Sequence, residues 1–531
     1  MVNNILRRLP LIYRTLSYLK YSQLFYQIKY RVLSKKRLSS YLKNSDRPVS
    51  LHGISFTLPP GKTQLVHLHN TFNFLHLNVE FEEAINWNFQ DNGKLWNYNL
   101  QYFNYLGQND IANTVKENWL IDIGNWLNDG RLKLEPYPVS LRVMNTIRFL
   151  SVDSINNTTI IENVFAQLQY LNKHLEYHIL GNHLLENAFA LLMGGHAFRK
   201  EEWDKKAKDI LYLELKEQVL NDGAHFELSP MYHQVILFRV LELADWYSRL
   251  QHPDKAFLNF VKDKARQMLG WLQAITFKNG DIPHFNDSAI EIALTSNELF
   301  RMGALLKLEP LENCSLSKSG YRKYMLGDYE CVVDVAEPGP SYQPGHSHAD
   351  ALSFVLYKSA KPFIVDIGTS TYQPGQRRNY ERSTSAHNTV VVNDQNQSEV
   401  WGGFRLGWRA SVKIINEDAV QLEAEHNGYY KAFGVYHKRK FHFSDNSIEI
   451  ADHIGNASGK LLFHFHPDCE VLLTEDAYVV LIKEKGFIKF ENASRLSLKE
   501  YEFAEGFNKY REAFKVEVDF KSELKATINF L

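Results

Sequence analysis

The chain has 531 residues, of which 44% are hydrophobic and 23% charged, and its formal net charge at pH 7 is −1. This length favours two large domains, because a single hydrophobic core usually stops growing at about 250–300 residues. A net charge near zero creates no global field for a polyanion, which argues against a nucleic-acid-binding protein and requires local Arg, Lys and His clusters to hold any acidic substrate.

The cysteine spacing argues against a protein built on disulfides or on a thiolate metal site, and the apolar runs argue against a membrane-spanning protein. The three cysteines are far apart and show no CxxC spacing, so neither a disulfide framework nor a thiolate metal site is indicated, although one disulfide remains open. No stretch of 18 or more apolar residues suggests a membrane span.

The first 37 residues contain nine basic side chains and no acidic one, and charges interrupt the apolar positions throughout. A secretory signal would continue a basic start with an uninterrupted apolar stretch and a small-residue cleavage site, and that order is absent. We predict a basic amphipathic helical region over residues 1–50 that docks on the protein itself, or on an anionic membrane surface or a partner.

Residues 51–306 are expected to form a mainly helical domain. From about Asn97 to Leu306, apolar residues recur at three- and four-residue steps. The predicted helices are 110–127, 137–151, 159–180, 183–198, 201–218, 231–250 and 254–275. Serial helices with short connections are typical of a bundle, a solenoid or a closed α/α toroid, and periodicity does not choose among these.

Residues 307–319 are rich in serine and contain Pro310 and Asn313, which predicts a linker. From 320 to 531, short runs of β-branched and aromatic residues alternate with turn signals, which predicts an antiparallel β-sandwich. The runs are 329–335, 352–357, 363–366, 389–392, 447–452, 460–466 and 477–482.

The densest chemical signal is the segment YQPGHSHAD at 342–350. On an extended segment His346 and His348 project to the same face, because side chains alternate with period two. Downstream, Asp366 ends an apolar run and His387 precedes another β run. Two histidines and a carboxylate at neighbouring strand ends suit zinc or a similar divalent ion, while ordinary hydrogen bonds are the alternative explanation of these histidines.

Two further motifs lie in the helical half. In GNHLLENA at 181–188, Asn182 and His183 stand at the start of an amphipathic helix, where helix capping is the alternative role of the asparagine. In ELSPMYHQ at 227–234, Ser-Pro begins a helix and Tyr232 falls in its first turn, where a tyrosine usually serves packing.

Together these motifs resemble the heparinase II/III superfamily of polysaccharide lyases, which also includes oligo-alginate lyases and broad glycosaminoglycan lyases. The resemblance runs from roughly Trp96 to Arg405 and is carried by GNHLLENAFAL, ELSPMYHQ, HSHADALSF, PFIVDIGTSTY and NYERSTSAHNTVVV. It implies an incomplete α/α toroid followed by an antiparallel β-sandwich, in agreement with the helical and β patterns described above. It also implies cleavage of uronic-acid-containing glycans by β-elimination, with glycosaminoglycans favoured and alginate or a capsular polymer as alternatives.

The resemblance implies roles for the motif residues. Asn182, His183 and His346 would bind and neutralise the substrate carboxylate, because the C5 proton is hard to remove while that carboxylate is ionised. Tyr232 would be the acid at the glycosidic oxygen. It would also serve as the base if adjacent cationic histidines lowered its pKa from the reference value of about 10.

A second tyrosine from the sandwich serves in some members of the superfamily, and Tyr372 is favoured here over Tyr380. The resemblance further implies a divalent metal, with zinc as the expected ion and no organic cofactor. The implied ligands are His348, Asp366 and His387. This metal would brace the loop that carries His346.

Other side chains are candidates for substrate binding, since Arg can bind an acidic group bidentately and Trp can stack on a sugar face. They are Arg142, Asn99, Tyr380, Trp401 and Arg405. Each of them is equally compatible with a structural role.

The expected partner is an acidic polysaccharide, with no nucleic acid, and the oligomeric state stays open. Superfamily members without a signal are often associated with surface polysaccharide assembly, so a cytoplasmic or envelope-associated bacterial protein is expected. The main rival class is a non-catalytic glycan-binding protein of polysaccharide assembly. A metal-dependent glycoside hydrolase would need two carboxylates facing each other across a cleft, whereas these motifs are rich in His, Asn and Tyr.

Overall fold

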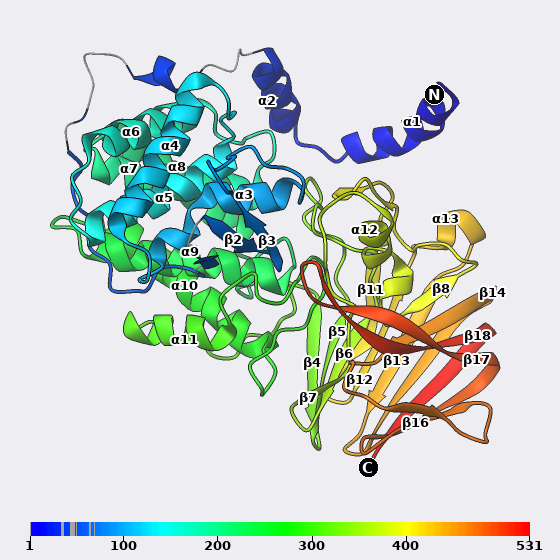
Figure 1. Cartoon of the computed structure of the whole chain (residues 1–531). Coiled ribbons are helices and arrows are strands. Elements are labelled where there is room, and N and C mark those ends of the chain that lie inside the picture. The colour runs from blue at the N-terminus through cyan, green and yellow to red at the C-terminus, as the bar shows by residue number, and fades with distance from the viewer. Residues whose placement is uncertain (1, 33–36, 43–47, 49, 63–64, 68–69) are drawn as a thin grey trace.

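The computed structural model describes all residues except 1, 33–36, 43–47, 49, 63–64 and 68–69, and the side chains of residues 2–8 and of His67 also lie outside the description. Two of the predicted basic residues, Lys35 and Lys36, therefore lie outside the described residues. Figure 1 shows a helical half, blue to green, beside a sheet half, yellow to red. In the described part of the chain, no helix is both long enough and apolar enough to cross a bilayer.

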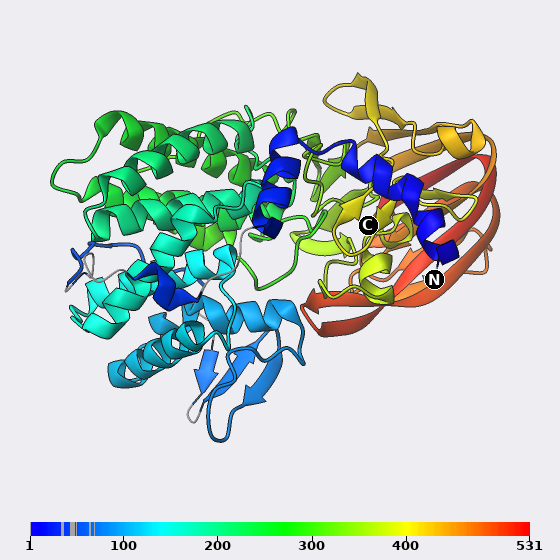
Figure 2. The ribbon, with the colours of Figure 1, turned by 90° about the horizontal axis from the view of Figure 1, so that it is seen from above.

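Two helices at the N-terminus, α1 (Val2–Leu16) and α2 (Tyr21–Val32), form what we call the N-terminal strap. Figure 2 shows α1 over the sheet half and α2 over the helical half. The short 3-10 helix Leu38–Tyr41 follows. Within the described residues of the predicted basic region, α1 and α2 contact the rest of the protein through Arg14 and Tyr30.

A small three-stranded antiparallel sheet precedes the helices. Its strands are β1 (Leu65–His67), β2 (Thr71–Phe74) and β3 (Leu77–Glu80). Alternate residues Phe72 and Phe74 are buried under it. The sequence prediction missed this sheet because strands of three or four residues are too short to show a period of two.

The toroid helices agree with the predicted segments to within a few residues, except at one end. Their bounds are α3 (Lys94–Tyr102), α4 (Asn113–Asp129), α5 (Pro136–Val152), α6 (Thr158–Lys173), α7 (Gly181–Ala197), α8 (Glu201–Gln218), α9 (Pro230–Ser248), α10 (Lys255–Ile275) and α11 (Ser296–Leu305). The predicted helix 159–180 ends seven residues early, because residues 174–180 form a turn. Helices α3 and α11 were not predicted.

Side-chain caps explain where several helices begin. Asn157, Ser229 and Asp254 each accept a hydrogen bond from a backbone N–H in the first turn of α6, α9 and α10. Thr295 and Glu298 form a reciprocal capping box at α11. Such caps satisfy the N–H groups that the first helical turn leaves unpaired.

After residues 306–320, all of which are described and carry neither helix nor strand, two antiparallel sheets follow. The smaller has the order β4 (Tyr321–Leu326), β5 (Tyr329–Asp334), β6 (Phe354–Lys358), β7 (Lys361–Ile364). The larger has the order β11 (Val412–Glu417), β12 (Gln421–His426), β13 (His437–Phe443), β14 (Ser447–His464), β18 (Lys509–Phe530), β17 (Gly486–Gly506), β16 (Val479–Ile482), β15 (Val471–Leu473), with β8 (Val390–Val392) on β14.

A shared apolar core packs between the two sheets and makes them a sandwich. It joins side chains such as Val333 and Leu356 of the smaller sheet to Ile450 and Phe463 of the larger one. The predicted strands 447–452 and 460–466 are one continuous strand, β14, interrupted only by a register shift between His453 and Ser458. All three cysteines are free, so the disulfide that composition left open does not form.

The tip of the β17–β18 hairpin reaches the small sheet of the helical half. His76 Nδ1 lies 2.9 Å from the carbonyl oxygen of Phe507, and Asn508 donates to the carbonyl of Leu75 at 3.0 Å. These contacts, together with the N-terminal strap, join the two halves on either side of the space between them.

Candidate active site

A cavity of about 1660 Å³ lies where the toroid, the sandwich and the N-terminal strap meet. Pockets for drug-sized molecules measure roughly 300–1,000 Å³, so this cleft has room for a chain of several sugars. All five residues predicted as catalytic line it, namely Asn182, His183, Tyr232, His346 and Tyr372.

Asn182 and His183 lie in the first turn of α7. The N-cap residue is Leu180 and makes no side-chain cap, so the capping role considered for Asn182 is not observed. Instead, the Asn182 backbone N–H and Nδ2 donate to the two carboxylate oxygens of Glu227, at 3.2 and 3.3 Å. Its Oδ1 is buried and has no partner in the described part of the chain. Glu227 therefore fixes the nitrogen of the Asn182 amide, while the amide oxygen has no hydrogen-bond partner among the described residues.

His183 lies in a negatively charged environment. Its Nδ1 lies 3.2 Å from a carboxylate oxygen of Glu176, and its ring centroid lies 4.4 Å from that of Tyr137. Burial lowers the pKa of His183, but the charge and hydrogen bond of Glu176, with Glu227 and Glu186, outweigh burial and raise it above 6.5. The structure therefore favours a cationic imidazole at this end of the cleft.

Tyr232 is placed by the start of α9. Ser229 caps the helix by accepting from the Tyr232 N–H, and Pro230 occupies the first helical position. The Tyr232 ring stacks on the His346 imidazole with centroids 3.9 Å apart, and its hydroxyl accepts from the Tyr372 hydroxyl at 3.3 Å. The two tyrosines and His346 thus form one contiguous cluster in the cleft.

The expected downward pKa shift of Tyr232 is wrong. Burial raises the pKa of Tyr232 well above 10, and the nearby Tyr372, Asp287 and Glu227 raise it further. Burial and the neighbouring carboxylates therefore hold this phenol neutral and suited to donate a proton.

Tyr372 differs from Tyr232 in its contacts. Burial, Asp287 and Glu227 raise the pKa of Tyr372 well above 10, and the Arg378 guanidinium and the hydrogen bond with Tyr232 offset only part of that rise. The Arg378 guanidinium carbon lies 5.0 Å from the Tyr372 ring centroid. Of the two phenols, Tyr372 has contacts that would stabilise a phenolate.

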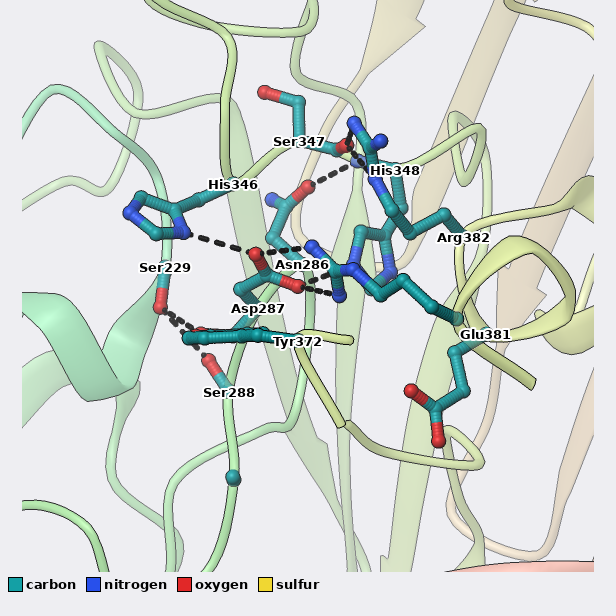
Figure 3. A network of polar contacts seen from close by, with 12 residues as sticks. Ser229, Asn286, Asp287, Ser288, His346, Ser347, His348, Tyr372, Glu381 and Arg382 are labelled. Atoms are coloured by element: carbon teal, nitrogen blue, oxygen red, sulfur yellow. Dashed lines mark hydrogen bonds and ion pairs between the residues drawn. The ribbon is translucent and has the colours of Figure 1, made fainter. Parts of the chain in front are cut away.

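Asp287, in the loop between α10 and α11, is the hub of the site, as Figure 3 shows. Its carboxylate lies 2.9 Å from His346 Nδ1 and 2.9 Å from His348 Nε2, and it accepts both terminal nitrogens of Arg378. Burial would raise the pKa of Asp287, but Arg378 and the two histidines hold it well below 3.8. The carboxylate is ionised and fully buried.

Sequence reasoning missed Asp287. It lies in the stretch HFNDS at 284–288, outside every motif that we recognised, and an acidic residue in a loop carries no spacing signal. Glu227 stands inside the motif ELSPMYHQ but was given no role, although it meets both Asn182 and, at 3.6 Å, His346 Nε2. Both ring nitrogens of His346 therefore face carboxylates.

The HxH segment is a loop with turns and not the extended segment that we expected. Asn286 and Asp287 hold it through the His348 N–H to Asn286 Oδ1 hydrogen bond and the Asp287 N–H to His346 carbonyl hydrogen bond. His346 lines the cleft, whereas His348 is buried behind it. The two histidines share Asp287 but face different surroundings.

His348, Asp350 and His387 form the one group in the described part of the chain that could hold a metal ion. Each offers a ligand atom within 4.8 Å of the others, and all three residues are buried. His348 Nδ1, Asp350 Oδ2 and His387 Nε2 are buried polar atoms without a hydrogen-bond partner among the described residues. Buried polar atoms are rarely left unpaired, so this donor set fits a divalent cation.

Asp366 lies outside that group, which corrects the predicted ligand set. Its Oδ2 lies 2.6 Å from His387 Nδ1, on the ring nitrogen that does not face the group. Asp287 holds His348 through Nε2 in the same way. A carboxylate on the second ring nitrogen is the usual support of a metal-binding histidine. The structure thus gives Asp366 the position of a supporting carboxylate and adds Asp350.

Three of the five predicted substrate-binding residues line the cleft, namely Asn99, Trp401 and Arg405. The Arg405 guanidinium covers one face of the Trp401 ring at 4.7 Å, and the Trp401 indole donates to Thr15 of the N-terminal strap at 3.2 Å. At most one face of Trp401 is therefore available to a sugar.

Arg142 and Tyr380 do not line the cleft, and their predicted role in substrate binding is wrong. Arg142 is buried inside the toroid, where it donates to Gln167 Oε1 at 2.6 Å and to the Gln101 carbonyl at 3.2 Å. The Tyr380 hydroxyl points to Lys515 Nζ, at 3.4 Å. Residue type and spacing could not separate these two positions from cleft positions, because neither shows what a side chain faces in the folded chain.

Two family models match the chain: "Heparinase II/III N-terminus" over residues 138–304 and "Heparinase II/III-like, C-terminal" over residues 310–531. Among curated proteins, a heparin-sulfate lyase of Bacteroides stercoris is 25% identical over 408 residues, which is 69% of this chain and 59% of the relative. A heparin-sulfate lyase of Pedobacter heparinus is 25% identical over 387 residues, 64% of this chain and 55% of the relative. The chain thus spans little more than half the length of these relatives.

Solved structures share the fold. A heparinase III structure matches with a TM-score of 0.68 at 18% identity, covering 86% of this chain and 80% of the other. A mutant of the heparan sulfate lyase HepC from Pedobacter heparinus matches with a TM-score of 0.59 at 17% identity, covering 96% and 87%. The two family models lie end to end over the toroid and the sandwich, and the chain belongs to the heparinase II/III family.

Proposed function

We propose that this chain is a polysaccharide lyase that cleaves uronic-acid-containing glycans by β-elimination and leaves unsaturated uronate ends. Glycosaminoglycans such as hyaluronan, chondroitin sulfate and heparan sulfate are the favoured substrates. The observation that carries the proposal is the meeting of the Asn182–His183 pair, the Tyr232–Tyr372 pair and His346 in one cleft. The heparin-sulfate lyases among its relatives support the same class.

The first task is to neutralise the substrate carboxylate so that the C5 proton becomes acidic. His183, whose pKa is raised, would supply positive charge at one end of the cleft. His346, flanked on both ring nitrogens by the carboxylates of Asp287 and Glu227, would add a second imidazole beside Tyr232. Asn182 would hold the substrate by hydrogen bonding. Charge placed where the transition state develops it is usually the largest catalytic contribution.

The second task is a pair of proton transfers. A Tyr372 phenolate would take the C5 proton while the C5–H electrons form the C4–C5 double bond and the bond from C4 to the glycosidic oxygen breaks. Tyr232 would give its proton to that leaving oxygen. This assignment rests on one difference in contacts: Tyr372, Asp287 and Glu227 all raise the pKa of Tyr232, whereas the Arg378 guanidinium opposes the rise in the pKa of Tyr372.

We also propose that His348, Asp350 and His387 hold a divalent metal, with zinc as the expected ion, and that it acts as a brace. When bound, the ion would supply positive charge beside the buried carboxylates and would fix the loop between His346 and His348. The chain's own part at His348 is to present a neutral imidazole. Burial lowers the pKa of His348 to about 4, against the opposing effect of Asp287, so this histidine is unprotonated at neutral pH.

The test is the ultraviolet absorbance of unsaturated uronates during incubation of the purified full chain with hyaluronan, chondroitin sulfate, heparan sulfate and alginate in parallel. A rise with one polymer that disappears in Tyr232→Phe would establish β-elimination and identify the substrate class. A flat trace with all four, together with affinity for one of them, would favour the rival proposal of a glycan-binding protein of polysaccharide assembly.

A further inference from the structure

Helix α2 of the N-terminal strap presents an uncovered apolar stripe. Tyr21, Phe25, Ile28 and Val32 are spaced by four, three and four residues, so they lie on one face of the helix. Their exposed fractions are 92%, 61%, 65% and 80%. Apolar side chains are rarely exposed in such a continuous row on a helix, and a row of this kind usually marks an interaction surface.

Helix α1 carries a similar stripe. Leu9, Tyr13 and Leu16 follow the same helical spacing and are 49%, 74% and 47% exposed. The two stripes lie on consecutive helices that cross the molecule from the helical half to the sheet half (Figure 2).

The outward position of these stripes is set by polar contacts on the other faces of the helices. On α1, Arg14 makes a two-point ion pair with Glu399 of the sandwich, at 2.8 and 2.5 Å. On α2, the Tyr30 hydroxyl donates to the Leu175 carbonyl of the toroid at 2.6 Å. Lys20, between the helices, pairs with Glu217 at 2.6 Å. These contacts hold both helices in a defined orientation with the apolar stripes exposed.

The charged residues of the strap itself all have one sign. Residues 1–37 contain nine Lys and Arg and no Asp or Glu, whereas the whole chain has a net charge of −1. Lys29 and Arg31 flank the α2 stripe and are exposed. An apolar helix face bordered by basic side chains, with Tyr and Phe among the apolar residues, suits an anionic lipid surface. A protein interface would instead favour mixed charges and few lysines.

We propose that the N-terminal strap docks this protein on the surface of an anionic lipid bilayer through Leu9, Tyr13 and Leu16 of α1 and Tyr21, Phe25, Ile28 and Val32 of α2. The basic residues attract the strap to the anionic headgroups, and the stripes insert at the boundary with the acyl chains. The protein is thereby peripheral to the membrane. This proposal does not depend on the lyase reaction.

The docked position has a consequence for the cleft. Leu16 and Ile28 belong to the stripes and also line the cleft, as does Leu24. Docking therefore brings one side of the cleft to the lipid surface, where a glycan held at the membrane would reach it.

The experiment is co-sedimentation of the full chain with vesicles of phosphatidylcholine alone and of phosphatidylcholine mixed with phosphatidylglycerol. We expect binding to the anionic vesicles and weaker binding to the neutral ones, and this difference should become smaller as the salt concentration is raised. Phe25→Ser and Val32→Ser should each reduce the affinity for anionic vesicles roughly tenfold, since each removes one inserted apolar side chain. Neither residue lines the cleft.

The matched control is Leu473→Ser, a residue 56% exposed on β15, the edge strand of the larger sheet; this variant should bind vesicles like the unmodified chain. Equal sedimentation with and without anionic vesicles would overturn the proposal, as would unchanged binding of both stripe variants. A stripe variant that converts a dimer to a monomer in analytical ultracentrifugation, with no change in vesicle binding, would assign the stripes to a second copy of the chain instead.

Discussion

His346 and His348 are two residues apart and hydrogen-bond the same carboxylate, yet they serve two different regions of the molecule. His346 stacks on Tyr232 and faces the cleft, while His348 is fully buried beside Asp350 and His387. Asp287 binds one histidine through each carboxylate oxygen. A single buried carboxylate therefore couples the reactive surface of the cleft to the proposed metal brace behind it.

The largest effect should come from the cleft side of this comparison. Tyr232→Phe keeps the ring that stacks on His346 but removes the proton donor, so we expect kcat/KM to fall about 10²–10⁴-fold. Tyr380→Phe is the control, because the Tyr380 hydroxyl points to Lys515 and away from the cleft. Activity should be measured on the polymer that is cleaved fastest, with thermal unfolding as the check of folding. Equal losses in the two variants would contradict the assignment.

Asp287→Asn should damage both regions at once. It leaves Arg378 buried without its ion-pair partner, and breaking a buried pair in this way costs about 3–5 kcal/mol of unfolding free energy. Denaturant unfolding measures the loss, and metal content and activity should fall with it. Asp129→Asn, which removes an exposed pair with Arg131, should cost less than about 1 kcal/mol. If Asp287→Asn lowered activity but left metal content intact, the coupling between the regions would be refuted.

Removal of the metal should destabilise the buried region around His348. A chelator is expected to lower the melting temperature by roughly 5–10 °C, as expected for loss of a ligand bound at a hundredfold excess over its dissociation constant. His387→Ala should melt at a similarly reduced temperature and should show no further response to the chelator. Tyr232→Phe should retain its metal, and the chelator should still lower its melting temperature. Elemental analysis and calorimetry give both readouts, and a chelator effect that persists in His387→Ala would exclude this site.

Two single variants sharpen the ligand set. If Asp350 binds the metal and Asp366 supports His387, Asp366→Asn should weaken metal affinity about 10–100-fold and Asp350→Asn should weaken it more. Competition with a chromophoric chelator ranks the two affinities. The reverse order would restore Asp366 as the ligand.

The smallest expected effect is a pH dependence on the cleft side. Because the pKa of folded His183 is above its unfolded value of 6.5, its protonation stabilises the fold below pH 6.5, and this contribution is lost as pH rises through the folded pKa. The kcat/KM should also fall as pH rises through this pKa, because the positive charge of His183 is lost. His183→Gln should flatten both profiles, measured by urea unfolding and initial rates between pH 6 and 9. Unchanged profiles in His183→Gln would assign the charge to another group.

Local patterns predicted the helices well because amphipathic periodicity is imposed by the core that each helix faces. Helices α7, α8 and α10 lie within two residues of the predicted segments. The small sheet escaped prediction because its strands are too short for a pattern, and β14 was divided because a register shift interrupts its alternation. Local propensity does not reveal which short runs join across the sandwich.

The site was only partly predictable for a related reason. Tyr232, His346 and Tyr372 were found because they stand in motifs, and the structure brings them into contact. Asp287 was missed because nothing near it in the sequence signals chemistry. The role of base required a lowered pKa of Tyr232, and the pKa instead rises, because burial and neighbouring carboxylates depend on chain segments far apart in the sequence.

The sequence by itself determined that a helical half precedes a sheet half, which family the chain resembles, and which histidines, tyrosines and asparagine carry its motifs. The tertiary structure alone decided that Asp287 joins His346 to His348, that Asp350 and not Asp366 is grouped with His348 and His387, and that Arg142 and Tyr380 do not line the cleft. The physical reason is that side-chain type and spacing are local properties, whereas desolvation, ion pairing and access to a cleft depend on distances across the folded chain.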